Sequence, residues 1–516
     1  MRRFLLIAFV AGACHASPQH HPDSGLGVVG LQTSCEATAN EQVRQGLALL
    51  HHMMYEDAFN AFRQAQETQP GCAMAYWGQA MTFVHPLWSD PPDAKKFSAA
   101  KNLLRAASRL GGTTPLERAY LDAAQAYFKV GRSAKEVENL RAFARGWERV
   151  HLLYPLDDDA TLFYALGQLA TADPADKAFA QQQRAGKLIE DIFASHPDHP
   201  GAQHYIIHAY DVPALAPRAL AVAREYGKIA PDVPHALHMP SHIFTRLGLW
   251  DESIEWNEKS AAAAANRPVA GAVSLHYLHA LDYLAYAYLQ RGEDAKAESV
   301  FVTLQALRPP VQSELAVAYA FAAVPARLAL ERHDWQRATS ISARVPEWYP
   351  WDHAPAVEAI SHFARALGAA HTGDMRLARA SLDRLAQLRD KAAETSAYWR
   401  TQVEIQRTSA LAWLQYAEGA RDQALETMRA AAALEAATEK HPVTPGEVLP
   451  AGELLADMLL AAGEYREARN AYEQSLVRSP NRRNSLQGSV RAAKLAGDQD
   501  DVFSSRLKSI AGPSVQ

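Results

Sequence analysis

Histidines are concentrated in one stretch of the chain, residues 196–242, which holds seven of the 21 histidines. Four of them form two pairs with the same internal spacing, His204 with His208 and His238 with His242. Each member of the second pair follows its counterpart by 34 residues. Because residues four apart share one face of a helix, each pair would present two imidazoles side by side. The regular spacing predicts one site built from both pairs.

Imidazole pairs at this spacing are a common way for a helix to hold zinc, copper or iron. The zinc-protease motif HExxH is excluded, because Tyr205 stands where the general base is required. A single helix cannot bring His204, His208 and Asp211 to one ion, since seven residues span about 10.5 Å and ligand bonds are about 2 Å long. Helices packed about 8–10 Å apart would bring the two histidine pairs together. We therefore predict that the four histidines bind a divalent transition metal, copper or zinc rather than iron.

Pro240 lies between the histidines of the second pair. In an uninterrupted helix this proline would remove a hydrogen bond at a cost of about 3 kcal/mol, and such local violations are expected at functional sites. A helix that begins at Pro240 explains the residue equally well. Both interpretations keep His238 and His242 near each other.

The composition limits the class of protein. With 516 residues the chain is too long for one ordinary core, so several domains or a repeat array are expected. A net charge of -5 and the absence of a Lys/Arg run argue against a nucleic-acid partner. The chain contains no Gly-x-Ser-x-Gly elbow, phosphate-binding glycine loop or Cys-x-x-Cys pair.

The N-terminus is typical of an export signal. Residues 1–16 combine two arginines, an apolar run and then small residues. Cleavage after Ala16 is one outcome; a lipoprotein signal in which Cys14 carries the lipid is the other. Residues 17–34 are rich in Pro, Gly and polar residues and are predicted to be a flexible leader. We expect a periplasmic or secreted protein, membrane-anchored if lipidated, and no transmembrane span in the mature chain.

A helical repeat pattern follows, clearest over residues 463–480: a turn glycine, an aromatic residue, small residues and a final proline (Gly463, Tyr465, Ala468, Ser475 and Pro480). This pattern, which extends over most of residues 36–510, resembles the tetratricopeptide repeat family. The sequence segments HPGAQHYIIHAYD and HALHMPSHIFTRLG resemble segments of a group of secreted bacterial members of that family. The resemblance implies an all-α, right-handed α-solenoid of about eight to ten helix pairs. It implies no particular chemistry.

Four blocks of repeats are expected along the chain. They are N-terminal repeats over 35–110, irregular helical repeats over 111–199, histidine-rich central repeats over 200–310 and C-terminal repeats over 311–511.

In tetratricopeptide arrays the first helix of each pair lines a concave groove. When the repeat positions of that family are counted along this chain, the four histidines face the groove. The same count places five further residues there that would orient the metal ligands: Asp211, His235, His279, Asp282 and Tyr286.

Cys35 and Cys72 are 37 residues apart, close to one repeat. Each precedes or opens a first helix, and stacked helix starts would bring the two side chains near each other. We predict a disulfide in an oxidising compartment, with two free thiols as the alternative.

Two functions compete. The first is an exported metalloprotein with its ion in the groove, for storage, delivery or catalysis; if it is an enzyme, a metal-dependent oxidoreductase is favoured over a hydrolase. The second is a non-enzymatic scaffold that binds a peptide or protein partner in the same groove, with the imidazoles serving as hydrogen-bonding groups.

Overall fold

The computed structural model describes residues 25–88, 90–498 and 501–511. Within these residues the chain is helical, with two isolated β-bridges and no strand. None of the described helices combines the length and the apolar character that crossing a membrane requires. The predicted export signal over 1–16, including Cys14, and the first part of the leader lie outside the described residues.

The described helices follow one another as twelve pairs of neighbours in contact. The pairs are α1 (Ala37–His51) with α2 (Tyr55–Thr68), α3 (Ala73–Met81) with α4 (Ala94–Ala107), α5 (Pro115–Val130) with α6 (Glu136–Leu153), α7 (Asp158–Ala170) with α8 (Ala180–Ser195), α9 (Pro200–Tyr210) with α10 (Ala216–Ile229), α11 (Pro234–His238) and α12 (Pro240–Leu247) with α13 (Trp250–Ala265), α14 (Leu275–Arg291) with α15 (Asp294–Ala306), α16 (Leu315–Leu330) with α17 (Trp335–Ser340), α18 (Pro355–Thr372) with α19 (Met375–Ala393), α20 (Ala397–Ala417) with α21 (Arg421–Ala436), α22 (Ala451–Ala462) with α23 (Tyr465–Arg478), and α24 (Arg483–Ala496) with α25 (Asp501–Ile510). A 3₁₀ turn, η1 (Trp351–His353), precedes α18.

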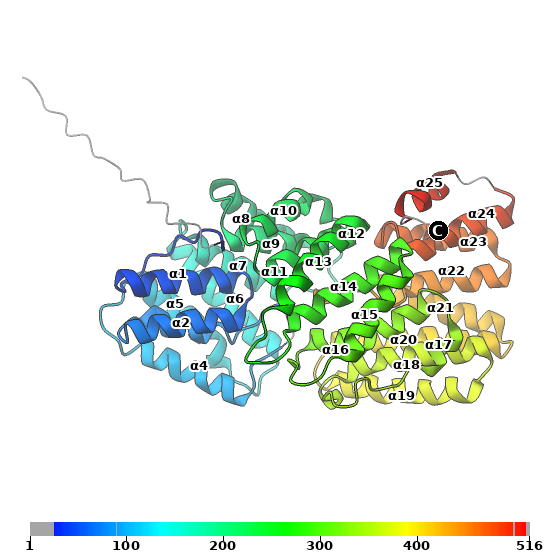
Figure 1. Cartoon of the computed structure of the whole chain (residues 1–516), viewed down its shortest axis with the longest axis horizontal. Coiled ribbons are helices and arrows are strands. Elements are labelled where there is room, and N and C mark those ends of the chain that lie inside the picture. The colour runs from blue at the N-terminus through cyan, green and yellow to red at the C-terminus, as the bar shows by residue number, and fades with distance from the viewer. Residues whose placement is uncertain (1–24, 89, 499–500, 512–516) are drawn as a thin grey trace, which may run out of the picture.

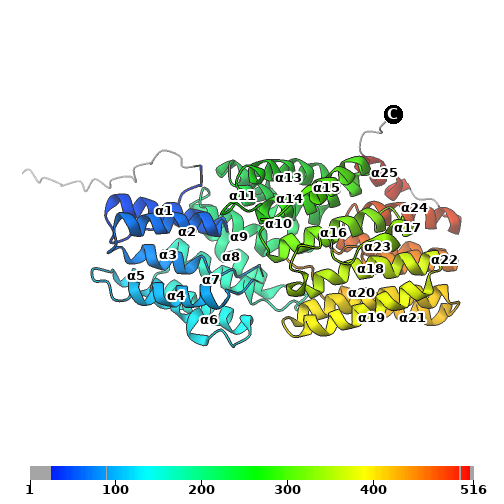
Figure 2. The ribbon, with the colours of Figure 1, turned by 60° about the horizontal axis from the view of Figure 1, so that its bottom comes forward.

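The prediction of an all-α solenoid is confirmed. The helix pairs run from α1–α6 at one end of the long axis to α17–α25 at the other, with α9–α14 between them (Figures 1 and 2). The array has more pairs than the eight to ten predicted, because α5–α8 lack the repeat signature but are well specified locally. Thr114 and Glu117 form a capping box at the start of α5, and Asp157 caps α7.

The C-terminal helices return to the central ones. The Trp250 indole donates a hydrogen bond to the Asn481 carbonyl at 2.9 Å, and the Arg482 guanidinium donates one to the Tyr286 hydroxyl at 3.2 Å. Gly248 ends α12 with φ +66°, and a β-carbon there would lie 2.1 Å from the carbonyl oxygen of Pro480. Glycine is therefore required at this position both for the turn and for the close approach.

The expected flexible leader is wrong for residues 25–34, because apolar side chains hold this segment against the repeats. Leu26, Val29 and Leu31 are buried. The backbone N–H of Val28 donates to the Asp198 carbonyl at 3.0 Å, at the turn before α9.

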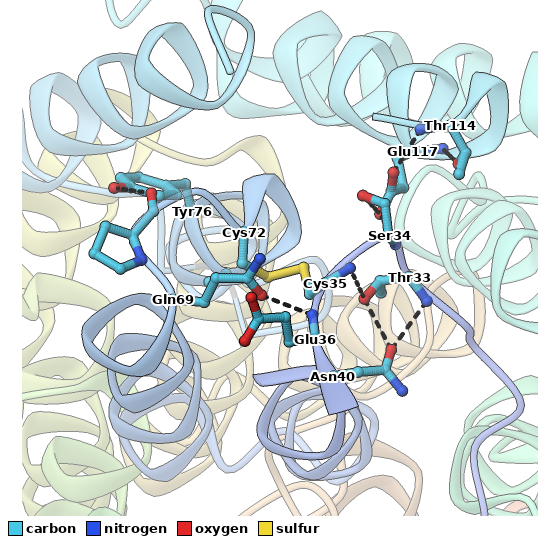
Figure 3. Close-up of a disulfide and its surroundings, with 12 residues drawn as sticks. Thr33, Ser34, Cys35, Glu36, Asn40, Gln69, Cys72, Tyr76, Thr114 and Glu117 are labelled. Carbon is cyan, nitrogen blue, oxygen red and sulfur yellow. Dashed lines mark hydrogen bonds between the residues drawn. A yellow bond between two sulfur atoms is a disulfide. The ribbon is translucent and has the colours of Figure 1, made fainter. Parts of the chain in front are cut away.

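Cys35 and Cys72 are joined by a disulfide, with their α-carbons 5.2 Å apart (Figure 3). Cys72 is the N-cap of α3, and Cys35 lies two residues before α1. The Glu36 N–H donates to the Gln69 side-chain oxygen at 2.7 Å beside the bond. The disulfide thus ties together the starts of two stacked first helices.

We expect the substitution Cys35→Ser with Cys72→Ser to lower the free energy of unfolding by about 4 kcal/mol, since the bond closes a loop of about 37 residues in the unfolded chain. Denaturant unfolding of the oxidised protein and the double variant would measure this difference. Equal midpoints would contradict it.

Candidate metal centre

The histidines singled out by sequence lie together inside the molecule. Seven imidazoles meet between α9, α11, α12 and α14: His204, His208, His235, His238, His242, His276 and His279. All are at most 5% exposed except the half-buried His208. The histidines lie on successive first helices, the helices predicted to line the groove, and other segments of the chain cover them.

Two segments distant in sequence form the cover. The Trp88 ring, from the loop after α3, lies 5.4 Å from the ring of His235 and 5.9 Å from that of His279. The connection between α21 and α22, residues 437–450, contributes the backbone carbonyl of Thr444, which accepts a hydrogen bond from the Tyr283 hydroxyl at 3.1 Å.

Six of the seven imidazoles form two groups of three rather than one group of four. His235 joins His204 and His208, and His279 joins His238 and His242; within each group one ring nitrogen per residue lies within 4.8 Å of the others. Each histidine pair is thus joined by one histidine from the first helix of the next repeat. The two groups approach at the rings of His208 and His242, whose centres are 6.0 Å apart.

Hydrogen bonds fix the tautomers of His238 and His242. Nδ1 of His242 lies 3.0 Å from the Asp211 carboxylate, and Nδ1 of His238 lies 2.7 Å from the Asn257 side-chain oxygen. Asn257 is oriented by donating its own N–H to the Ser253 carbonyl. Since these oxygens only accept, both Nδ1 atoms carry the proton and both Nε2 atoms carry a lone pair.

These two Nε2 atoms face each other at 3.0 Å. The Tyr283 hydroxyl is 3.3 Å from Nε2 of His242, but its one proton is directed to the Thr444 carbonyl. Burial lowers the pKa of both histidines and so favours the neutral form of each ring. Two nitrogens bound to one ion at about 2.0–2.1 Å lie about 3.0–3.4 Å apart, so the pair has the spacing of two ligands of a single metal ion.

The other group has a related arrangement. Nδ1 of His204 lies 2.6 Å from the His51 carbonyl, so its Nε2 carries a lone pair, and this atom lies 3.0 Å from Nε2 of His208. Neither ring nitrogen of the buried His235 has a hydrogen-bond partner among the described residues.

A third cluster, His51, Asp159 and His199, satisfies its own hydrogen bonds. Asp159 accepts from Nε2 of His51 at 2.8 Å and from Nε2 of His199 at 3.2 Å. The remaining nitrogens accept from the Tyr205 hydroxyl and the Gly201 N–H. Every ring nitrogen is used, so this cluster joins α1, α7 and α9 without needing an ion.

Asp211 contacts Nδ1 of His242, one of the predicted ligands, and is itself held by two cations. Arg246 and Lys440 lie 2.8 and 3.0 Å from its carboxylate oxygens. Burial opposes ionisation, but these cations hold the pKa of Asp211 well below its usual range. Burial lowers the pKa of Lys440 to about 8, against the attraction of Asp211.

Four of the predicted orienting residues have other roles. His235 and His279 belong to the imidazole groups themselves. Asp282 instead pairs with the buried Arg327, and Tyr286 accepts a hydrogen bond from Arg482. Arg327 lies on α16, the first helix of the next repeat, whereas Arg482 lies just before α24, where the chain returns to the central helices.

The connection over residues 437–450 lies on the inner face as an internal peptide. Its carbonyls accept from side chains of four helices: Glu439 from Tyr398, Thr444 from Tyr283, Gly446 from Arg327, and Thr438 from Arg478. Sequence reasoning missed this segment, as it missed Trp88 and Asn257, since no spacing links them to the histidines. His276 could have been found, because it lies three residues before His279 on one helix face.

Comparison with known proteins supports the resemblance in part of the chain. The tetratricopeptide repeat model matches residues 453–484, which contain most of α22 and all of α23. No curated protein matches by sequence.

Solved structures with similar helix arrangements are distant. Yeast Tom70 is 14% identical, with 91% of this chain and 99% of that one covered at a TM-score of 0.38. The human IFIT1 dimer with PPP-AAAA is 11% identical, covering 88% and 89% at 0.39. The P58(IPK) TPR domain is 12% identical, covering 89% and 99% at 0.22.

The buried histidines predict acid sensitivity of the metal-free protein. Burial lowers the pKa of His208 to about 3 and of His276 to about 4, and lowers it also for His204, His235, His238, His242 and His279. The folded-state pKa lies below the unfolded value near 6.5, so protons bind the unfolded chain preferentially and stability falls as the pH drops below about 6.5.

Each such histidine contributes about 1.4 kcal/mol of lost stability per pH unit in this window. Urea unfolding of chelator-treated protein at pH 7.5 and at pH 5.5 would show a much lower midpoint at the acid pH. Equal stability at both would contradict the burial of neutral imidazoles.

Proposed function

We propose that this chain is an exported helical-repeat protein that binds a transition metal, copper or zinc, through His238, His242 and His279. One observation carries the proposal: two lone-pair nitrogens, with tautomers fixed by Asp211 and Asn257, face each other at 3.0 Å in a buried site. Two such nitrogens repel each other unless a cation lies between them. A metal ion removes the conflict without protonating either ring.

The ligand set favours ions that accept nitrogen donors. Three imidazoles with a fourth position open are a common arrangement for zinc, and imidazole also suits copper. The Asp211 carboxylate, which accepts the Nδ1 proton of His242, would raise the basicity of that ligand and fix its ring. A redox role would need copper or iron, since zinc does not change its oxidation state.

Export is the second part of the proposal. The apolar segment after two N-terminal arginines supports it, and so does the Cys35–Cys72 disulfide, since such bonds persist in oxidising compartments.

A scaffold function is the alternative. The tetratricopeptide-type repeat architecture supports a role in protein interaction. The specific observation that favours it is the connection over 437–450, whose carbonyls are bound by side chains on the inner face as a partner peptide's would be. Metal-free protein from the exporting host would favour this alternative.

Removing the facing nitrogens should remove an ion. We expect the His238→Ala/His242→Ala variant to lose at least one ion per chain. Elemental analysis would measure this in untagged protein from two cultures, one supplied with copper and the other with zinc. His196→Ala and His333→Ala serve as controls, because both residues lie outside the three clusters. A double variant with wild-type metal content and unchanged helical circular dichroism would refute the site.

The mature N-terminus tests export separately. Mass spectrometry of the protein from its native host should find Ser17 as the first residue, or a lipidated Cys14. An intact Met1 in that material would contradict export.

A further inference from the structure

We propose that the chain binds a second ion at His204, His208 and His235, next to the first, so that six imidazoles form a two-metal centre. The idea of a paired centre rests on the proposed function of His238, His242 and His279. The second site has evidence of its own in the first imidazole group.

The first line of evidence is the direction of the lone pairs. His204 donates its Nδ1 proton to the His51 carbonyl at 2.6 Å, and its Nε2 lone pair is directed at Nε2 of His208, 3.0 Å away. That spacing again equals the separation of two nitrogens on one ion. A proton on Nε2 of His208 would also satisfy this pair, so the third residue of the group decides.

His235 is the deciding residue. It is 2% exposed, and both of its ring nitrogens are buried without a hydrogen-bond partner among the described residues. Buried polar atoms are normally paired, and an unpaired one requires an explanation. One of these nitrogens lies within 4.8 Å of the ligand atoms of His204 and His208, so an ion held by all three would supply a partner for that nitrogen.

The two groups are close enough to act together. The rings of His208 and His242 are 6.0 Å apart, and those of His235 and His238 are also 6.0 Å apart in a stacked arrangement.

The donor atoms identify the class of ion. All six ligands are imidazoles, and among the described residues the nearest carboxylate, Asp211, already compensates Lys440 and Arg246. Calcium and magnesium require oxygen ligands and are excluded by this set. Copper and zinc accept it.

Stoichiometry gives the test. Untagged full-length protein is stripped with a chelator, loaded separately with Cu²⁺, Zn²⁺ and Mg²⁺, and desalted before elemental analysis. We expect two copper or two zinc ions per chain and no magnesium. The His204→Ala/His235→Ala variant and the His238→Ala/His242→Ala variant should each retain one ion, and the control His333→Ala should retain two.

Proximity is measured on the same copper-loaded samples. Electron paramagnetic resonance should show coupled spins, with less signal than the copper content, in wild type, and one isolated Cu²⁺ signal in each double variant. A single ion in wild type that only the His238/His242 variant loses would overturn the second site and leave the proposed function standing. No ion in wild type would overturn both, and two ions with uncoupled spins would overturn the paired centre. The wild-type measurement needs no variant to fold.

Discussion

When one ring nitrogen of a neutral imidazole donates a hydrogen bond to a buried acceptor, the other ring nitrogen carries a lone pair and can only accept. This constraint determines the chemistry of the central helices. One Nδ1–H group donates a hydrogen bond to each of Asp211, Asn257 and the His51 carbonyl. In each of these histidines Nε2 is then directed toward the Nε2 of another histidine. In water such a nitrogen would find a donor at once. In a site closed by Trp88 and the 437–450 connection, the nitrogen does not obtain that hydrogen bond from water.

The contrast with the third cluster shows that burial alone does not create the conflict. His51 and His199 are as deeply buried as the other histidines, yet Asp159 accepts a hydrogen bond from each of them. A carboxylate within reach of two rings converts histidines into structural cross-links. Among the described residues of the central groups, Asp211 is the carboxylate bonded to an imidazole; it contacts His242 and is otherwise engaged by two cations. The distribution of acidic residues, rather than the number of histidines, separates a cluster whose hydrogen bonds are all satisfied from one whose lone pairs face each other.

Much of this arrangement could be predicted from the sequence. The spacing of four within each pair and of 34 between pairs placed His204, His208, His238 and His242 on adjacent first helices, where the structure has them. The grouping could not be predicted in the same way. Whether a pair meets the next pair or a single histidine from the next helix depends on the rotation between repeats, which a repeat period does not specify.

Contacts between distant segments were also beyond the sequence. Trp88 reaches the site across more than a hundred residues of chain, and Lys440 reaches Asp211 over 229 residues. Local periodicity carries information about neighbours within a repeat and between adjacent repeats, and these contacts belong to neither class. Tyr286 illustrates the same limit, because Arg482, which it contacts, lies just before α24, far along the chain.

The 437–450 connection changes how the whole array should respond to force or heat. In an ordinary solenoid each repeat contacts only its neighbours, so the stability of the array is close to a sum over adjacent units, and the ends can fray independently. Here one connection binds side chains from α14, α16, α20 and α23, and Lys440 ties it to the end of α9. The connection therefore links repeats that are not adjacent. We expect the protein to unfold as one cooperative unit, as a globular domain does, although its sequence pattern is that of a linear array.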